Sequence, residues 1–237
     1  SDIRRIKKDL CAVLEEFNLG IICHLPTFVY TADLSPEIRT ASLKEMERSI
    51  LTAAEAGAQK AVLHPSMVTG LGSFVLEDVK NLAKESLIQL ADCADSAGIQ
   101  LCLENMFPGY QVLYEPEEFE AVFKEFTGLH LCLDTGHAHI KNPGNQRLFN
   151  FIKKMPEKIG HVHISDNKGK RDEHLRVGKG TIDFKRFIFK LVESGYNDTI
   201  TLEIFSSEIA DLIKSKDRIT RFVEKSFEQK GIKPGGF

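Results

Sequence analysis

The chain has 237 residues, with 31 lysines and arginines against 34 aspartates and glutamates, so its formal net charge is only -3. This near balance gives no electrostatic case for a nucleic-acid or membrane-surface partner. No apolar run reaches the ~18 residues of a membrane span, and the charged first residues are unlike a secretion signal.

The five cysteines are an odd number and include no Cys-x-x-Cys pair. We therefore expect reduced thiols and a cytoplasmic protein. The length suits one domain and no linker interrupts it, so residues 1–237 are predicted to form a single domain. Its glycine- and proline-rich end, residues 230–237, is predicted to be a flexible tail.

Short apolar runs alternate with longer segments of helical periodicity along the whole chain. The predicted strands are residues 20–24, 61–64, 99–104, 129–134, 160–165 and 199–203. The predicted helices are residues 3–17, 37–56, 76–97, 116–126, 136–151, 184–194 and 208–227. Strands that alternate with helices in this way form a parallel sheet with right-handed crossovers. The pattern predicts an α/β barrel of which six strand–helix units are visible.

A side chain that can bind a metal or move a proton stands at the end of each predicted strand. These residues are His24, His64, Glu104, Asp134, His163 and Glu203. The carboxyl ends of the strands of a parallel barrel converge on one face, where such folds place their chemistry. We therefore expect these side chains to surround a single site.

Glu104 and Glu203 each follow a leucine at the end of an apolar run. A carboxylate there is costly unless it is paired or coordinated. A buried salt bridge or a helix cap would explain either one alone, but Asp134 and His163 occupy equivalent positions on other strands. Together the four residues favour a metal site, and oxygen ligands with one imidazole suit Mn²⁺, Mg²⁺, Co²⁺ or Zn²⁺.

Further candidate ligands lie in the polar loop after the strand of His163. Asp172 and His174 are two residues apart, and an extended loop would let both reach one ion. With His137 they would complete a second set of nitrogen and oxygen ligands, and His24 and His64 would supply a third. For His137 alone, a helix cap is an equally good explanation.

Three other features lie in or beside this loop. Asp166 either orients His163 or binds substrate, and Gly178-Lys179-Gly180 is too short to be a phosphate loop. His161 shares a strand face with His163 but lies one layer deeper, which predicts a packing or supporting role.

Taken in order, these motifs resemble the xylose-isomerase-like barrel superfamily. The resemblance covers residues 20–205 and is carried by His24-Leu25-Pro26, Leu63-His64-Pro65, Leu103-Glu104-Asn105, Leu133-Asp134-Thr135-Gly136-His137, Val162-His163-Ile164-Ser165-Asp166-Asn167, Asp172-Glu173-His174 and Leu202-Glu203. The superfamily has an eight-stranded (β/α)8 barrel, a TIM barrel. It includes sugar and sugar-phosphate isomerases and epimerases, and metal-dependent endonucleases that cut at abasic sites.

The resemblance implies two alternative ligand sets. In the sugar enzymes one divalent ion is held by the positions that match Glu104, Asp134, His163 and Glu203. In the endonucleases three zinc ions use those four and five more, whose matches are His24, His64, His137, Asp172 and His174. All nine residues are present in this chain.

The chain departs from the endonuclease pattern at several points. Gly136 stands where the endonucleases typically have cysteine, and Thr27 stands where they have tyrosine. The extra loops that contact DNA are not found. The chain also opens on what would be the second helix. We therefore expect it to lack the first two barrel strands, and we expect a missing segment or an unusual homodimer.

We therefore expect a divalent-metal-dependent isomerase or epimerase acting on a small sugar, sugar phosphate or polyol. Glu104 and Glu203 would be the catalytic residues that move the proton on the α-carbon through an enediolate. The alternative is a zinc-dependent abasic-site endonuclease with a trinuclear site, and only this alternative implies a nucleic-acid partner. A third alternative is a barrel kept as a metal-binding module without turnover.

Overall fold

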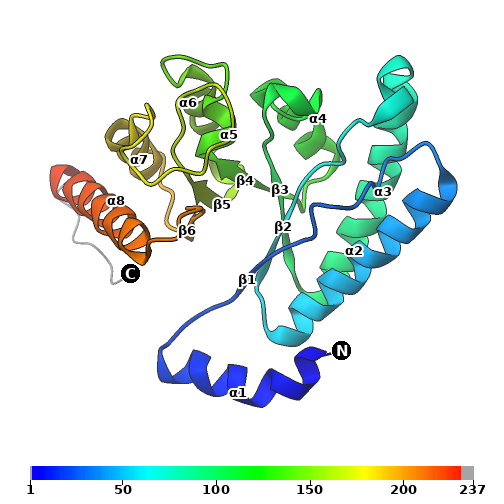
Figure 1. Cartoon of the computed structure of the whole chain (residues 1–237), viewed down its shortest axis with the longest axis horizontal. Helices are drawn as coiled ribbons and strands as arrows, with labels where there is room; N and C mark the ends of the chain where they lie inside the picture. Colours follow the sequence, from blue (N-terminus) through cyan, green and yellow to red (C-terminus); the bar gives the residue numbers. More distant parts are fainter. Residues whose placement is uncertain (1, 231–237) are drawn as a thin grey trace. The chain divides into compact units, whose positions relative to one another are not determined.

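The computed structural model describes residues 2–230 (Figure 1). The rest of the predicted tail, residues 231–237, lies outside the described residues. The chain divides into two compact units. The amino-terminal unit takes in the chain up to Glu104 together with Glu125–His130, and the carboxyl-terminal unit takes in Asn105–Lys124 and the chain from Leu131 onward. That the units make up a single domain stays a prediction.

The amino-terminal unit contains three parallel strands with helices between them (Figure 1). Its elements are α1 (Asp2–Glu16), β1 (Ile22–His24), α2 (Pro36–Ala56), β2 (Lys60–Leu63), η1 (Gly70–Phe74), α3 (Leu76–Ala97) and β3 (Gln100–Glu104). β2 pairs with β1 on one side and with β3 on the other, with Ala61 opposite both Cys23 and Leu101. α2 and α3 pack side by side, and α1 contacts α2.

The carboxyl-terminal unit repeats this architecture with three further parallel strands. Its elements are η2 (Pro108–Tyr110), α4 (Pro116–Glu125), β4 (His130–Asp134), α5 (Thr135–His139), α6 (Gln146–Lys154), η3 (Pro156–Lys158), β5 (Ile159–Ile164), α7 (Phe184–Glu193), β6 (Ile200–Leu202) and α8 (Ile209–Lys230). β5 lies between β4 and β6, with Val162 opposite both Leu133 and Ile200. The six strand–helix units predicted from the sequence are thus confirmed in the described residues.

β4 and β5 of the carboxyl-terminal unit are buried on both faces, whereas the three residues of β6 are partly buried. Leu131, Leu133 and Val162 are fully buried, as are Phe151 of α6 and Phe187 of α7. Continuous apolar runs are what a parallel sheet covered on both faces requires. The apolar side chains of β4 and β5 fit this burial. The polar side chains at the strand ends do not, and they need an explanation.

Each predicted residue lies at or beside the end of its strand. His24, Glu104 and Asp134 are the last residues of β1, β3 and β4, His163 is the penultimate residue of β5, and His64 and Glu203 directly follow β2 and β6. Neighbouring strands in each unit are parallel, so these ends lie at the same edge within the unit.

The single helix predicted for residues 136–151 is wrong in its middle. The structure has two helices, α5 and α6, separated by residues 140–145. Pro143 disfavours helical backbone at the preceding residue, and Gly144 takes a left-handed conformation with φ of 87°. Lys141 and Asn145 also have positive φ, of 54° and 60°. The turn shortens the helix that follows Asp134 and ends it at His139.

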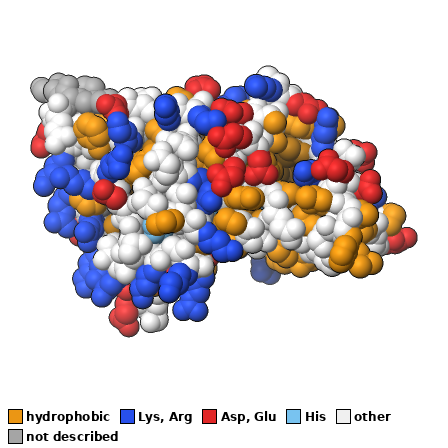
Figure 2. Space-filling model, turned by 90° about the horizontal axis from the view of Figure 1, so that it is seen from above, with side chains coloured by type: hydrophobic (Ala, Val, Ile, Leu, Met, Phe, Trp, Pro, Cys, Tyr) orange, Lys and Arg blue, Asp and Glu red, His pale blue; other side chains and the backbone are white. Residues whose placement is uncertain are grey.

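Two surface properties bear on partners. Both α7 and α8 carry more basic than acidic residues. Lysine and arginine side chains gather at the left of Figure 2, where the carboxyl-terminal unit lies, and the overall charge of -3 conceals this local basic region. Among the described residues, no helix is both long and apolar enough to cross a membrane. All five cysteines are free thiols.

Candidate functional site

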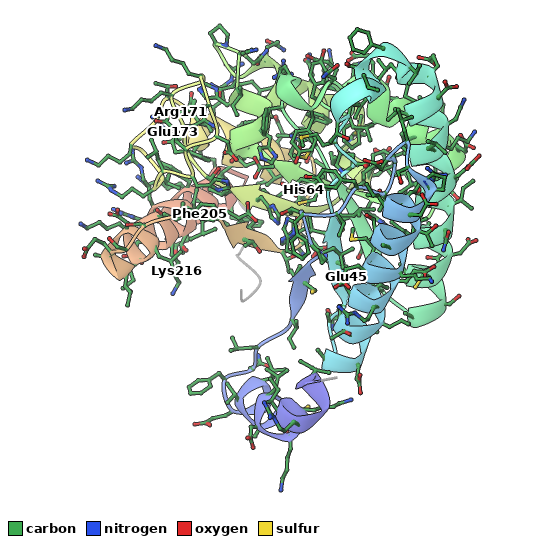
Figure 3. All side chains as sticks on the ribbon, turned by 45° about the vertical axis from the view of Figure 1, so that its right-hand side comes forward. Glu45, His64, Arg171, Glu173, Phe205 and Lys216 are labelled. Atoms are coloured by element: carbon green, nitrogen blue, oxygen red, sulfur yellow. The ribbon has the colours of Figure 1, made fainter. Side chains whose placement is uncertain are left out.

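The first group of predicted ligands lies in the amino-terminal unit, and we call His24, His64 and Glu104 the amino-terminal set. His64 Nε2 lies 2.9 Å from Glu104 Oε2, and His24 Nε2 lies 3.3 Å from the same oxygen. The two rings meet edge to face with their centroids 4.9 Å apart; His64 is labelled in Figure 3. The His24 Nδ1–H donates to the carbonyl of Leu25 at 2.8 Å, which leaves Nε2 directed at Glu104.

The second group lies in the carboxyl-terminal unit, and we call His137, Asp172 and His174 the loop set. Asp172 Oδ2 lies 3.3 Å from His137 Nε2 and 2.8 Å from His174 Nε2. His137 Nδ1 donates to the carbonyl of Asn105 at 2.9 Å, and His174 Nδ1 donates to that of Glu203 at 3.0 Å. Both histidines thus turn Nε2 toward the same carboxylate.

The third group, the central set, consists of Asp134, His163 and Glu203. His163 Nδ1 lies 3.2 Å from Glu203 Oε1 and 3.9 Å from Asp134 Oδ2. Asp134 Oδ1 accepts the backbone N–H of His137 at 2.6 Å and so caps the amino terminus of α5. The capping role that the sequence allowed for His137 therefore belongs to Asp134.

Each set is the kind of donor group that a divalent ion takes. The amino-terminal and loop sets offer two imidazoles and one carboxylate, and the central set offers two carboxylates and one imidazole. In the loop set, Asp172 Oδ1 is buried and accepts no hydrogen bond from the described residues. Buried oxygens of this kind are usually satisfied, so the loop set fits a bound cation.

The electrostatics of the loop set couple its members. Burial by itself would raise the pKa of the Asp172 carboxyl, but hydrogen bonds from His137 and His174 lower that pKa well below its ordinary value. Burial would lower the pKa of His174, yet its pairing with Asp172 raises it. The pairing therefore stabilises an ionised carboxylate beside a protonated imidazole. By contrast, burial lowers the pKa of His139.

All nine predicted ligands thus belong to one of three clusters, and each cluster lies within one unit. The partnership of His137 with Asp172 and His174 that the spacing suggested is observed. That Glu104 shares an ion with Asp134, His163 and Glu203 combines residues of both units and stays a prediction.

Asn105 follows Glu104 in the sequence, but the motif alone does not reveal its role. The Asn105 side chain is fully buried, and its Oδ1 accepts from Asp134 N at 2.7 Å while its Nδ2 donates to Asp134 O at 3.1 Å. Its carbonyl also accepts from His137, as described above. Asn105 thus fixes members of both the central and the loop sets, and its position next to a strand-end glutamate was the available signal.

Phe205 is a second residue that the sequence did not reveal. Its ring stacks on the His174 imidazole with centroids 3.9 Å apart and an interplanar angle of 11°, and it lies beneath the loop of Arg171 and Glu173 (Figure 3). Its backbone N–H donates to the carbonyl of His174 at 3.0 Å. The Phe205 residue is nevertheless 76% exposed, so an apolar surface borders the loop set.

His161 has the supporting position predicted for it. It is fully buried below His163, and its two ring nitrogens lie 2.8 Å and 3.0 Å from the hydroxyls of Thr199 and Thr201. Its ring meets the His163 ring at 90° with centroids 5.1 Å apart. His161 therefore packs β5 against β6 under the central set.

Gly136 is explained by its neighbour Ser165. A Cβ at this position would clash with Ser165 Oγ and would lie 3.3 Å from both Asn167 Nδ2 and Asp134 Oδ1. A side chain here, such as the cysteine typical of the endonucleases, would require Ser165 Oγ to move. The departure is a matter of local packing beside Asp134.

The chain is similar in sequence to a known family and to several known proteins. Residues 2–223 match the family model described as xylose isomerase-like TIM barrel. An uncharacterized protein of Methanocaldococcus jannaschii is 29% identical over 227 residues, which covers 92% of this chain and 74% of that protein. A probable endonuclease 4 of Mycobacterium leprae is 27% identical over 192 residues, which covers 77% of this chain and 73% of that protein.

Solved structures also match. The crystal structure of a D-tagatose 3-epimerase-like protein aligns with a TM-score of 0.85 at 27% identity, covering 95% of this chain and 85% of that chain. This alignment confirms the predicted fold class over nearly the whole chain.

Replacing Gly136 by alanine should destabilise the protein by about 1–3 kcal/mol, because the added Cβ overlaps Ser165 Oγ. Among the described residues, Ser165 Oγ has no hydrogen-bond partner, so Ser165→Ala alone should cost little. The double variant should then recover much of the loss. Urea denaturation of the three variants measures this, and strictly additive effects would contradict the explanation.

His174 and His139 should give opposite pH dependences in metal-free protein. The raised pKa of His174 gives stability that is complete below about 6.5 and is lost as pH rises through the folded value. The lowered pKa of His139 gives stability that is present above about 6.5 and is lost as pH falls.

The measurement is the free energy of unfolding in chelator at several pH values, for wild type, His174→Gln and His139→Gln. The difference between wild type and His174→Gln should shrink toward alkaline pH, and the difference for His139→Gln should shrink toward acid pH. If the stability difference changed with pH in the same direction for both variants, the Asp172–His174 pairing could not be the source of the pH dependence.

Proposed function

Because the chain belongs to the xylose isomerase-like TIM-barrel family, as its motifs predicted, we propose that it is a divalent-metal-dependent isomerase or epimerase of a small sugar, sugar phosphate or polyol. The observation that carries this proposal is the central set, in which His163 and Glu203 lie within 3.2 Å beside the buried Asp134. The likeness to a D-tagatose 3-epimerase-like protein supports the same reaction class.

We propose that Glu104, Asp134, His163 and Glu203 hold the catalytic ion. The donors of the central set fit such an ion, and Glu104 is a fully buried carboxylate at an equivalent strand end. A divalent ion bound there would polarise the substrate carbonyl and stabilise negative charge on the adjacent oxygen. Zn²⁺, Mn²⁺, Mg²⁺ and Co²⁺ all suit these ligands.

In this proposal, Glu104 and Glu203 carry out the proton transfer. One carboxylate removes the proton from the carbon next to the carbonyl, and the other returns a proton to the same carbon or to its neighbour. His163, 3.2 Å from Glu203, would help to orient that carboxylate. His24 and His64 would do the same for Glu104.

Glu104→Gln and Glu203→Gln should each lower turnover by at least about 100-fold, because a carboxamide cannot accept the proton. The assay is epimerisation of ketoses and ketose phosphates with Mn²⁺ or Co²⁺, followed by incorporation of solvent deuterium at the reacting carbon. Glu193→Gln is the matched control, since Glu193 pairs with Lys190 on the surface of α7. Normal epimerisation by either active-site variant would reject the assignment.

A second candidate is a zinc-dependent abasic-site endonuclease. The specific observation in its favour is the loop set, which a site for one ion does not require, together with the amino-terminal set. The 27% identity to a probable endonuclease 4 and the basic surface of α7 and α8 agree with it (Figure 2). On this proposal the three sets hold three ions that stabilise charge on a phosphodiester. Zinc-dependent incision of an abasic duplex with salt-sensitive binding would favour this candidate over the sugar enzyme.

A further inference from the structure

The loop from Asp166 to Ile182 carries two members of the loop set, Asp172 and His174. It joins β5 to α7 and contains no helix or strand among the described residues, apart from one isolated bridge between Asp166 and Leu175. Loops of this length without regular structure are mobile unless something holds them. Ligands on such a loop need a device that fixes their positions.

The side chain of Asp166 holds the loop at three points. Its Oδ2 accepts the backbone N–H groups of Gly178 and Gly180, both at 2.8 Å, and its Oδ1 accepts that of Ile182 at 3.3 Å. Its own backbone exchanges two hydrogen bonds with Leu175, at 2.9 Å and 2.8 Å. The side chain is fully buried, and hydrogen bonds to an ionised carboxylate are the strong ones.

The glycines at 178 and 180 make this arrangement possible. A Cβ on Gly180 would clash with Asp166 Oδ1 and with the carbonyl of Asn167. Gly178 has a φ of 86°, and a Cβ there would clash with the guanidinium of Arg218. The Gly178-Lys179-Gly180 segment is thus a cradle of N–H groups filled by the chain's own carboxylate.

His174, which directly precedes Leu175, has a strained backbone. His174 has a φ of 44°, a left-handed conformation that residues with a side chain seldom adopt. Its successor, Leu175, is the residue that Asp166 binds through both backbone groups. Strain of this kind persists only where the surroundings impose it, and it concentrates at functional sites.

We infer that Asp166 is a positioning residue that presets the loop so that Asp172 and His174 face His137 for a divalent cation. Asp166 acts through the backbone of Gly178, Gly180 and Leu175. The inference rests on the proposed metal dependence and adds that the loop set binds an ion of its own, which the second candidate function also requires. It also replaces both roles that the sequence allowed for Asp166, since its carboxylate oxygens serve the loop.

The test is Asp166→Asn in the full chain, which keeps the shape of the side chain but turns an amide toward backbone N–H groups. Metal-free protein is titrated with Co²⁺ and followed by visible absorption, with Zn²⁺ calorimetry in parallel. The His174→Ala variant identifies the spectral component of the loop set. The affinity of that component should fall about 10- to 100-fold in Asp166→Asn.

Asp183→Asn is the matched control. Asp183 also accepts a backbone N–H, from Arg186 at 3.0 Å, but it caps α7 and lies outside the loop. We expect Asp183→Asn to lower stability and to leave the cobalt affinity of the loop set unchanged. An unchanged affinity in Asp166→Asn, or a loop-set component that His174→Ala does not remove, would overturn the inference. Sugar epimerisation is measured separately, so failure of the proposed function is seen independently.

A second measurement needs no variant. If Asp166 presets the loop, the amides of Gly178 and Gly180 should be protected from hydrogen exchange in metal-free wild type. Protection that develops only after Zn²⁺ is added would show that the ion orders the loop, and it would overturn the inference.

Discussion

Buried carboxylates at the ends of parallel strands are the constraint on which the rest of the structure depends. Glu104 and Asp134 are fully buried where the surrounding strands are apolar. An isolated carboxylate in such a place is strongly unfavourable, so each requires a positive or hydrogen-bonding partner. The chain supplies imidazoles, and His64 approaches Glu104 while His163 approaches Asp134. A group of carboxylates and imidazoles arranged in this way suits a divalent ion better than it suits a structural role.

The fold orients these groups by one repeated device. His24, His137 and His174 each donate Nδ1–H to a backbone carbonyl and direct Nε2 at a carboxylate. The three carbonyls belong to Leu25, Asn105 and Glu203, each of which directly follows a strand. Asn105 and Asp166 extend the device, because each uses a buried side chain to hold backbone that carries a ligand. These hydrogen bonds fix the orientation of side chains on loops relative to the neighbouring strands.

The strands and the carboxylates and imidazoles at their ends could be predicted because both are local. An apolar run that stops at Glu104 or Asp134 carries its own signal, and the order of such runs predicts a parallel sheet. The break between α5 and α6 differs from the predicted single helix because Pro143 disfavours helical backbone before it and Lys141, Gly144 and Asn145 take left-handed conformations. The role of Asp166 could not be read from the sequence, because its partners Gly178 and Gly180 are brought to it only by the course of the loop. The stack of Phe205 on His174 depends in the same way on distant segments meeting.

The most direct test of the central claim, that these carboxylate and imidazole clusters are ion sites, is elemental analysis of protein purified without added metal. The account predicts at least one tightly held divalent ion per chain, removed by chelator and reduced in variants of Asp134 or His163. About three zinc ions per chain would favour the endonuclease chemistry, and about one ion, especially manganese or magnesium, would favour the sugar enzyme. A chain that contains no divalent ion and gains no stability when Zn²⁺, Mn²⁺, Mg²⁺ or Co²⁺ is added would contradict the account.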